Sequence, residues 1–346
     1  MIKNLKLSIF AIFITFLVLD FLYSKYKNSK LIAVIEFDER FEYNFKKDIS
    51  SKSKFGSFLI NICTNSNGFR IECGKKKNLK KYKLALIGDS FIEGVGLDYN
   101  STIAGLIESK SDINVANLGV RSYSPANYLN KLIYLIEDGY KFEHVIIFLD
   151  ISDIQDEVFR SGKIRKSFKT NTINQNNTLY SILTSNLQMT YFLYFKFRSL
   201  IRNKLSYSNN EIFNNFDAYK KDYSRGSWTY DVKNEFRENG LNFSSQNMIN
   251  LAEYLNKRKI DFSLAIYPWP QQLIYDDIDS LQVIYWRKFC KKYNCKNFYN
   301  FFEDFFQLVD EKSLNYVLLN YYFYTDVHFN RNGNNIIAEK LIKDIN

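Results

Sequence analysis

One serine of this chain stands where it can act as a nucleophile. Ser90 lies in the sequence Gly-Asp-Ser-Phe at 88–91, directly after the apolar run 84–87, and a loop with two glycines follows it. On a tight turn between a strand and a helix, a serine hydroxyl points out of the sheet edge and can attack a carbonyl carbon. Ordinary turns use the same residue types, so Ser90 needs a base before it counts as a nucleophile.

The chain offers two histidines as the base. His144 begins an apolar run that predicts a buried strand. The start of a strand lies far from the edge where Ser90 is expected, so we interpret His144 as a packing or surface residue. His328 follows Asp326 by two residues, in a loop before the amphipathic run 335–345. A carboxylate this close can fix the imidazole in one tautomer and stabilise its charged form. The alternative for this pair is a solvated loop or a helix N-cap.

Five short blocks give the chain a resemblance to a known family. Gly-Asp-Ser-Phe at 88–91, Asn-Leu-Gly at 117–119 and Asp-x-His at 326–328 occur in that order. Together they resemble the SGNH (GDSL-type) hydrolase superfamily. Asn-Gly-Phe-Arg at 67–70 and Tyr-Pro-Trp-Pro at 267–270 resemble segments of its membrane-anchored bacterial members. The resemblance runs from about residue 65 to the C-terminus and leaves the middle of the chain unmatched.

The resemblance assigns roles to individual residues. Ser90 takes the place of the family's nucleophile, His328 that of its base, and Asp326 that of the acid that orients the base. The family's oxyanion hole uses the N–H groups of the serine and of the second-block glycine, here Gly119, and an asparagine side chain from a third block. At that third place this chain has Ser152, whose hydroxyl is a shorter donor. Loss of one oxyanion donor typically costs about 3 kcal/mol of transition-state stabilisation, so we expect a slower enzyme or a substitute donor.

A cluster of acidic residues allows a second interpretation of this region. Asp150, Asp153, Asp156 and Glu157 follow the third predicted strand, and groups of oxygen ligands can hold a hard cation. A second histidine or a companion ligand motif does not stand near them in the sequence. We therefore predict a site without metal or cofactor and keep the cation as the alternative.

Strands and helices alternate around these residues. The predicted strands are 84–87, 114–117, 145–149, 262–267 and 297–299, and the predicted helices are 101–109, 125–138, 246–258, 281–293 and 335–345. This alternation predicts an α/β fold with a parallel sheet covered on both faces, whose site lies at the carboxyl ends of the strands. Ser90, Gly119 and Ser152 each come just after a strand, so they converge on that edge. The resemblance implies the three-layer, flavodoxin-like SGNH fold with about five central strands.

Two parts of the chain lie outside this alternation. Residues 31–80 are rich in charge and end in a lysine-rich run, which we interpret as a juxtamembrane segment. Residues from about 154 to 244 contain apolar clusters. A structureless loop of this length is uncommon inside a domain, so we expect an inserted helical cap beside the site. The predicted organisation is an anchor at 1–30, the juxtamembrane segment, and a hydrolase-like domain at 81–346 that carries the insertion.

The N-terminus predicts a membrane anchor. Residues 7–23 are nearly all apolar with lysines on both sides, and about 17 such residues are the minimum for crossing a bilayer. A small-residue cleavage site does not follow, which favours an uncleaved signal anchor over a removed signal peptide. We expect one span of the cytoplasmic membrane with the catalytic domain on the extracytoplasmic (periplasmic) side, as the resemblance also implies. The alternative is a buried helix of a soluble domain.

Composition limits the partners. The formal net charge of +10 comes mostly from lysine, and the sequence shows no nucleic-acid module, so this charge fits an anionic membrane surface or polysaccharide. The four cysteines can form two local disulfides in an oxidising compartment, Cys63 with Cys73 and Cys290 with Cys295. They can equally be free and buried, and the sequence leaves both options open.

These features lead to a functional expectation. We expect a serine-dependent ester hydrolase or O-acyltransferase that acts on short acyl esters of cell-envelope glycan or lipid through Ser90, His328 and Asp326. Its expected partners are the acylated substrate, the membrane and an envelope protein, and not nucleic acid. The alternative is a non-catalytic SGNH-like domain that binds glycan or scaffolds an envelope assembly, which the missing third-block asparagine favours.

Overall fold

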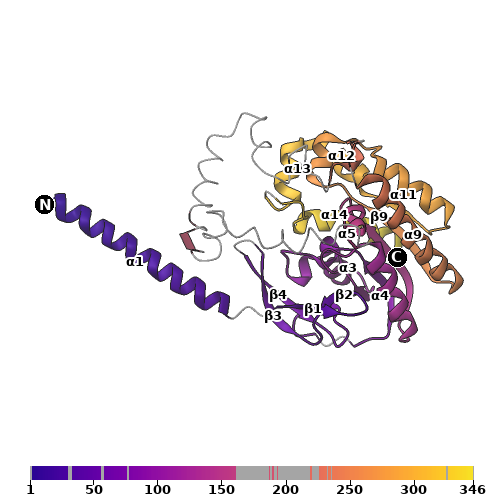
Figure 1. Ribbon diagram of the computed structural model, residues 1–346, viewed down its shortest axis with the longest axis horizontal. Coiled ribbons are helices and arrows are strands. Elements are labelled where there is room, and N and C mark those ends of the chain that lie inside the picture. Colours follow the sequence, from indigo (N-terminus) through magenta and orange to yellow (C-terminus); the bar gives the residue numbers. More distant parts are fainter. Residues whose placement is uncertain are drawn as a thin grey trace.

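The computed structural model of the 346-residue chain has an α/β body from which one long helix projects (Figure 1). The described residues are 2–29, 33–55, 58–75, 78–160, 187, 189–190, 193, 219, 226–231, 233–234, 236–324 and 326–345. Most of the expected cap at 154–244 therefore lies outside the described residues.

Five parallel strands form the centre of the body. They are β6 (Lys81–Ile87), β7 (Val115–Asn117), β8 (Lys141–Leu149), β9 (Asp261–Ile266) and β10 (Phe298–Asn300). They lie in the order β10-β9-β8-β6-β7, and each neighbouring pair is parallel. Counted along the chain from β6, this is the order 2-1-3-4-5 of flavodoxin-like folds. The predicted α/β class is confirmed, and each strand overlaps its expected range.

Three antiparallel strands extend the sheet beyond β7. β3 (Ser50–Phe55), β4 (Phe58–Thr64) and β5 (Arg70–Ile71) continue it in the order β7-β5-β4-β3, which makes an eight-stranded sheet. A separate hairpin of β1 (Ile35–Asp38) and β2 (Glu42–Phe45) joins the core through buried Phe41 and Phe45. All five strands come from residues 31–80, and Figure 1 shows β3 and β4 on the side of the body that faces the C-terminal end of the long helix.

Helices cover both faces of the sheet. On one face lie α4 (Pro125–Glu137), α9 (Arg237–Lys257) and α11 (Leu281–Lys292); on the other lie α3 (Ile103–Lys110), α12 (Phe301–Lys312), α13 (Leu314–Tyr321) and α14 (Arg331–Ile345). β8 shows why two cores form, because successive side chains of a strand point to opposite faces. Val145 and Ile147 pack into the first core, and Ile146 and Phe148 pack into the second.

Shorter helices lie at the carboxyl edge and in the connections. They are α2 (Ser90–Glu93), α5 (Asp153–Arg160), α10 (Pro270–Tyr275) and the 3-10 turns η1 (Tyr99–Ser101) and η5 (Ser227–Thr229). α2, α5 and α10 begin just beyond the carboxyl ends of β6, β8 and β9. Their first turns therefore meet at the edge where the sequence places the site.

The N-terminal helix α1 (Ile2–Ser29) is long and apolar. Its window Lys6–Tyr26 has a mean hydropathy of 2.2 with 12% buried, so by length and composition it can cross a membrane. Asp20 differs from its surroundings because it is buried, and its carboxylate accepts from the N–H groups of Met189 (2.9 Å) and Thr190 (2.7 Å). A described turn of the insertion therefore lies against α1.

Both cysteine pairs that the sequence allows are disulfide-bonded, so the option of free cysteines is wrong. Cys63 and Cys73 join β4 to the turn after β5, and Cys290 and Cys295 close the end of α11. All four cysteines of the chain are thus paired. Such pairing is typical of proteins in an oxidising compartment.

Candidate active site

Ser90, His328 and Asp326 lie in one hydrogen-bonded row. Ser90 Oγ and His328 Nε2 are 2.8 Å apart, and His328 Nδ1 and Asp326 Oδ1 are 2.5 Å apart. The backbone N–H of His328 also donates to Asp326 Oδ1 at 2.9 Å, so this carboxylate holds both the ring and its own loop. The fold brings Ser90 and His328 together across 238 residues of sequence. A nucleophile, a base and an orienting acid require this arrangement.

The end of β6 places Ser90 at the edge of the sheet. Asp89 caps α2, because its Oδ1 accepts from the N–H of Phe91 at 2.9 Å, and Ser90 is the first residue of this one-turn helix. Gly94 ends the helix at φ +77°, a left-handed conformation that favours glycine. The residues on either side of the serine therefore build the sharp turn that exposes it.

A buried arginine holds the loop behind the nucleophile. The guanidinium of Arg70, on β5, donates to the carbonyl oxygens of Glu93 at 2.5 Å, of Gly94 at 2.7 Å, and of Leu97. Burial lowers the pKa of Arg70 to about 10, which still leaves it charged at neutral pH. The carbonyl groups at the C-terminal end of a helix lack intrahelical donors, and Arg70 supplies them. The Asn-Gly-Phe-Arg segment thus supports the site from the antiparallel part of the sheet.

Hydrogen bonds on both sides of His328 hold the loop that carries it. The N–H of Phe323 donates to the His328 carbonyl at 2.9 Å, and Tyr322 and Phe329 form an antiparallel bridge. Asn330 fastens the loop further, since its Nδ2 donates to the Tyr322 carbonyl at 3.1 Å. The imidazole therefore lies on a fixed turn directly before α14.

Aromatic rings enclose the imidazole. The ring centroids of Phe91 and His328 are 4.9 Å apart, and Phe55, at the end of β3, meets His328 edge-on at 6.1 Å. The His328 side chain is 17% exposed. β3 therefore supplies one wall of the site although it is the outermost strand of the sheet.

Two opposing effects set the proton affinity of His328. Burial alone lowers the pKa of His328, but the hydrogen bond and charge of Asp326, together with the charges of Asp89 and Asp150, more than offset burial and raise this pKa above its usual value. Burial raises the pKa of Asp326, and its bonds to His328 outweigh burial and keep this pKa below its usual value. The pair therefore favours a charged imidazolium, as a base that must receive a proton requires.

The Ser90 hydroxyl has a second neighbour that we did not predict from the sequence. Its Oγ lies 3.1 Å from Asp89 Oδ2, and Asp89 Oδ1 accepts from the Tyr267 hydroxyl at 3.2 Å. Burial, together with the charge of Asp150, raises the pKa of the Asp89 carboxyl to about 7. A hydroxyl carries one proton, so a charged Asp89 competes with His328 for it. The Tyr-Pro-Trp-Pro segment was the signal in the sequence, because its tyrosine reaches Asp89.

The other acidic residues at this edge bond within the protein. Asp150 accepts from Trp269 Nε1 at 2.6 Å, and Asp153 accepts from the Tyr128 hydroxyl at 3.0 Å. Glu157 accepts from the start of α4 and from α9. Within the described part of the chain, no group of three or more such side chains is arranged to hold a metal ion. These carboxylates serve as internal acceptors that tie α5 to its neighbours.

Of the predicted oxyanion donors, Gly119 lies against the helix of the nucleophile. A Cβ at Gly119 would be 2.4 Å from the backbone N of Glu93, so the loop after β7 touches α2 with no side chain between them. The Gly119 N–H, however, donates to Asn117 Oδ1 at 3.1 Å. Ser152 is buried directly before α5, and among the described residues no hydrogen bond joins it to Ser90. The oxyanion roles of Gly119 and Ser152 stay predictions.

The second histidine belongs to the core. His144 is buried in β8, and its Nε2 lies 2.8 Å from the Ser263 hydroxyl on β9. Burial lowers the pKa of His144 to about 4, so its ring is neutral at neutral pH. This environment agrees with its interpretation as a packing residue.

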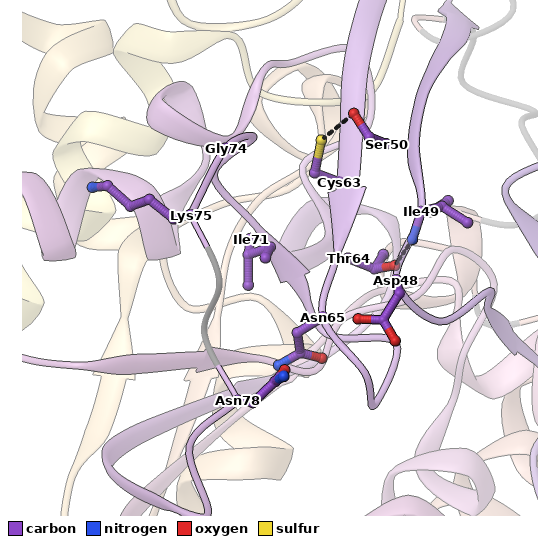
Figure 2. A pocket seen from close by; sticks show the side chains of 10 residues that line it. All are labelled: Asp48, Ile49, Ser50, Cys63, Thr64, Asn65, Ile71, Gly74, Lys75 and Asn78. Atoms are coloured by element: carbon purple, nitrogen blue, oxygen red, sulfur yellow. Dashed lines mark hydrogen bonds between the residues drawn. The ribbon is translucent and has the colours of Figure 1, made fainter.

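A separate cavity lies among the antiparallel strands. Its volume is about 530 Å³, and residues of β3, β4, β5 and the turn after β5 line it (Figure 2). Figure 2 shows the sulfur of Cys63 directed toward the Ser50 hydroxyl, at 3.4 Å. Ser90, His328 and Asp326 are not among its lining residues, so this cavity is distinct from the hydrogen-bonded row.

Comparison with known proteins finds similarity in structure alone. No family model and no curated protein matches the chain. One similar solved structure is LAE5, an α/β hydrolase enzyme from the metagenome of Lake Arreo, Spain, with 10% identity, a TM-score of 0.41, and coverage of 76% of this chain and 94% of the other. Another is assigned to the lipolytic G-D-S-L family, from Desulfitobacterium hafniense DCB-2, with 11% identity, a TM-score of 0.39, and coverage of 77% and 99%.

Proposed function

We propose that this chain is a membrane-anchored member of the SGNH hydrolase superfamily and acts on short acyl esters as a hydrolase or O-acyltransferase. One observation carries the proposal: Ser90, His328 and Asp326 form a hydrogen-bonded row. The row lies at the carboxyl edge of a parallel sheet, which is the usual place for a site in this strand order. Its geometry suits a nucleophile, a base and an orienting acid.

The first half of the reaction transfers the acyl group to the protein. His328 Nε2 takes the proton of the Ser90 hydroxyl while Oγ attacks the ester carbonyl, whose π electron pair moves to oxygen. Asp326 stabilises the imidazolium that results. The tetrahedral intermediate then expels the alcohol, which takes the proton from His328 and leaves an acyl-serine.

The second half releases the acyl group by the same steps. His328 removes a proton from the incoming hydroxyl, which attacks the acyl-serine and restores the Ser90 hydroxyl. Water as the attacking group gives hydrolysis, and a sugar hydroxyl gives acyl transfer. The same row of side chains serves both outcomes.

The oxyanion that forms in each half needs hydrogen-bond donors. We assign it the N–H groups of Ser90 and Gly119, with the Ser152 hydroxyl as the third donor. Gly119 lies against α2, and its N–H becomes free when the Asn117 side chain that accepts it rotates away. A single oxyanion donor typically contributes about 3 kcal/mol, so this rotation has a large effect on rate.

The anchor and the disulfides support an extracytoplasmic site. α1 is long and apolar enough to span a membrane, and two disulfides suit an oxidising compartment. We therefore assign the body to the extracytoplasmic side of the cytoplasmic membrane. The substrates available there are acylated glycans and lipids of the envelope, and an envelope protein that supplies the acyl donor fits the same place.

Labelling with a fluorophosphonate probe tests the proposal. We expect the full chain in an uncharged detergent to be labelled and to hydrolyse p-nitrophenyl acetate, and Ser90→Ala and His328→Ala to lose both activities. Two matched controls remove the same residue types outside the row. His144→Asn and Ser109→Ala, whose hydroxyl donates to a carbonyl within α3, should keep both activities. A wild type without serine-dependent labelling and without ester hydrolysis would refute catalysis.

One observation favours the non-catalytic alternative. The Gly119 N–H is engaged by Asn117, and Ser152 stands where the third donor is expected. A chain with a closed oxyanion site would bind an acylated glycan or scaffold an envelope assembly without cleaving an ester. Glycan binding by the wild type together with no labelling of Ser90 would support this alternative.

A further inference from the structure

A groove with basic side chains lies between the anchor and the candidate active site. Its volume is about 350 Å³, and residues 33–35, residues 52–54 and Arg121 line it. We call it the basic groove. Its charged lining residues are all cations, namely Lys52, Lys54 and Arg121. The groove therefore suits an anionic group.

A buried acid fixes Arg121 without occupying the groove. Glu93 accepts from the backbone N–H of Arg121 at 2.6 Å and from its Nε at 3.0 Å, and also from Nη2. Glu93 is fully buried, whereas the Arg121 side chain is 37% exposed. These bonds to Glu93 do not use Nη1. The arginine is thus held in place while its side chain stays partly exposed.

The short connection between α1 and the groove wall keeps the basic groove close to the membrane surface. Three residues connect Ser29, the end of α1, with Ala33 in the groove wall, and the four steps of the chain between them span at most about 14 Å. With α1 across the bilayer, the groove lies within reach of the lipid head groups on that side. Basic side chains near such a surface attract anionic lipids.

Two residues that line the basic groove, Arg121 and Lys54, are connected with the hydrogen-bonded row through neighbouring residues. Glu93, which holds Arg121, is the last residue of the one-turn helix that begins with Ser90. On the other side Lys54 precedes Phe55, whose ring meets the His328 imidazole. A molecule that places its anionic end in the groove can therefore present an ester to Ser90.

We infer that the basic groove binds the phosphate head group of a membrane lipid, so that the substrate is a lipid-borne acyl ester. The inference rests on the proposed ester chemistry at Ser90 and narrows its substrate class. Arginine and lysine are the side chains that bind phosphate oxygens by charge-assisted hydrogen bonds. The position beside α1 favours a phosphate that belongs to a lipid over one that is free in solution.

Binding of a short-chain phospholipid tests the inference. The full chain in uncharged dodecyl maltoside micelles is titrated with dihexanoyl phosphatidic acid, with uncharged dihexanoylglycerol and with inorganic phosphate, and heat is measured. We expect the phospholipid to bind at least about tenfold more tightly than either comparator. Equal binding of inorganic phosphate would overturn the lipid as the source of the anion, and equal binding of dihexanoylglycerol would overturn recognition of phosphate.

Lysine substitutions assign the binding to the groove. Lys52→Gln and Lys54→Gln should each weaken phospholipid binding about fivefold, the factor that corresponds to roughly 1 kcal/mol per basic residue at a lipid surface. Lys47→Gln is the matched control, because Lys47 is exposed before β3 and does not line the groove. Unchanged binding in the groove variants, or an equal loss in Lys47→Gln, would overturn the inference.

Labelling of the wild type separates this inference from the proposed function. If Ser90 is labelled but phospholipid binding does not depend on Lys52 and Lys54, the groove inference fails and the ester chemistry stands. If Ser90 is not labelled but binding depends on both lysines, the ester chemistry fails and the groove stands as a lipid-binding site.

Discussion

Replacement of Asp326 by asparagine isolates the electrostatic part of the proposed mechanism. The amide has nearly the same shape, and its oxygen can still accept from His328, but it carries no charge. In the wild type the hydrogen bond and charge of Asp326 raise the pKa of His328 against the effect of burial. Without that charge, one of the effects that oppose burial is lost and the pKa of His328 falls. An aspartate in this role contributes a factor of about 10⁴ to kcat, or roughly 5 kcal/mol of transition-state stabilisation.

The assay is the pH dependence of p-nitrophenyl acetate hydrolysis. The base must be unprotonated, so wild-type activity is lost as the pH falls through the raised pKa of His328. In Asp326→Asn this acid limb should move to lower pH, and the plateau should fall by about three to four orders of magnitude. The control Asp304→Asn, which removes an aspartate paired with Lys340, should leave both the acid limb and the plateau activity unchanged. A lowered plateau with an unmoved acid limb would refute the electrostatic role of Asp326.

Three further substitutions test the surroundings of the row. Folding raises the pKa of Asp89 to about 7, so the folded wild type binds this proton more tightly than the unfolded chain does. The free energy of unfolding of the wild type, measured in urea, should therefore fall relative to that of Asp89→Asn by about 3 kcal/mol between pH 4 and 7; a constant difference would contradict this. Arg70→Met leaves the carbonyls of Glu93 and Gly94 without donors and should lower the free energy of unfolding by about 3 kcal/mol, and stability equal to wild type would show that water replaces the guanidinium. Gly119→Ala drives a Cβ against α2 and should reduce kcat/KM for the ester at least about tenfold, whereas wild-type kinetics would disprove a tight contact there.

The parallel strands could be predicted from the sequence because their signal is local. β6, β8 and β9 are apolar runs that end at a loop, and the turn residues between the elements behave as expected; Gly139, for example, has φ +86° after α4. β3 gives no such signal, since it reads Ser-Ser-Lys-Ser-Lys-Phe and has one apolar residue. Only its pairing with the neighbouring strand β4 makes this segment extended. Strands of this kind are set by tertiary context.

The candidate site shows the same division. The sequence could predict His328 as the base for Ser90, because His144, the other histidine, begins a buried strand. The contacts of Asp89 with Ser90 and with Tyr267 could not be predicted from the sequence, because they depend on how the loops after β6 and β9 meet. Phe55 lies on the outermost strand, and nothing in its local sequence connects it with the imidazole. Residue types indicate chemistry, whereas the partners of a buried group follow from packing.

The path of β3, β4 and β5 decides how the chain can be shortened. A cut near Lys80, at the boundary that the sequence predicts for the hydrolase-like domain, would remove Arg70 from behind α2 and Phe55 from beside His328. It would also leave β7 without its neighbour β5, as an open sheet edge that can pair with another molecule. A version that begins at residue 33 keeps all eight strands of the sheet and loses the helix α1 with its Asp20 contacts to Met189 and Thr190.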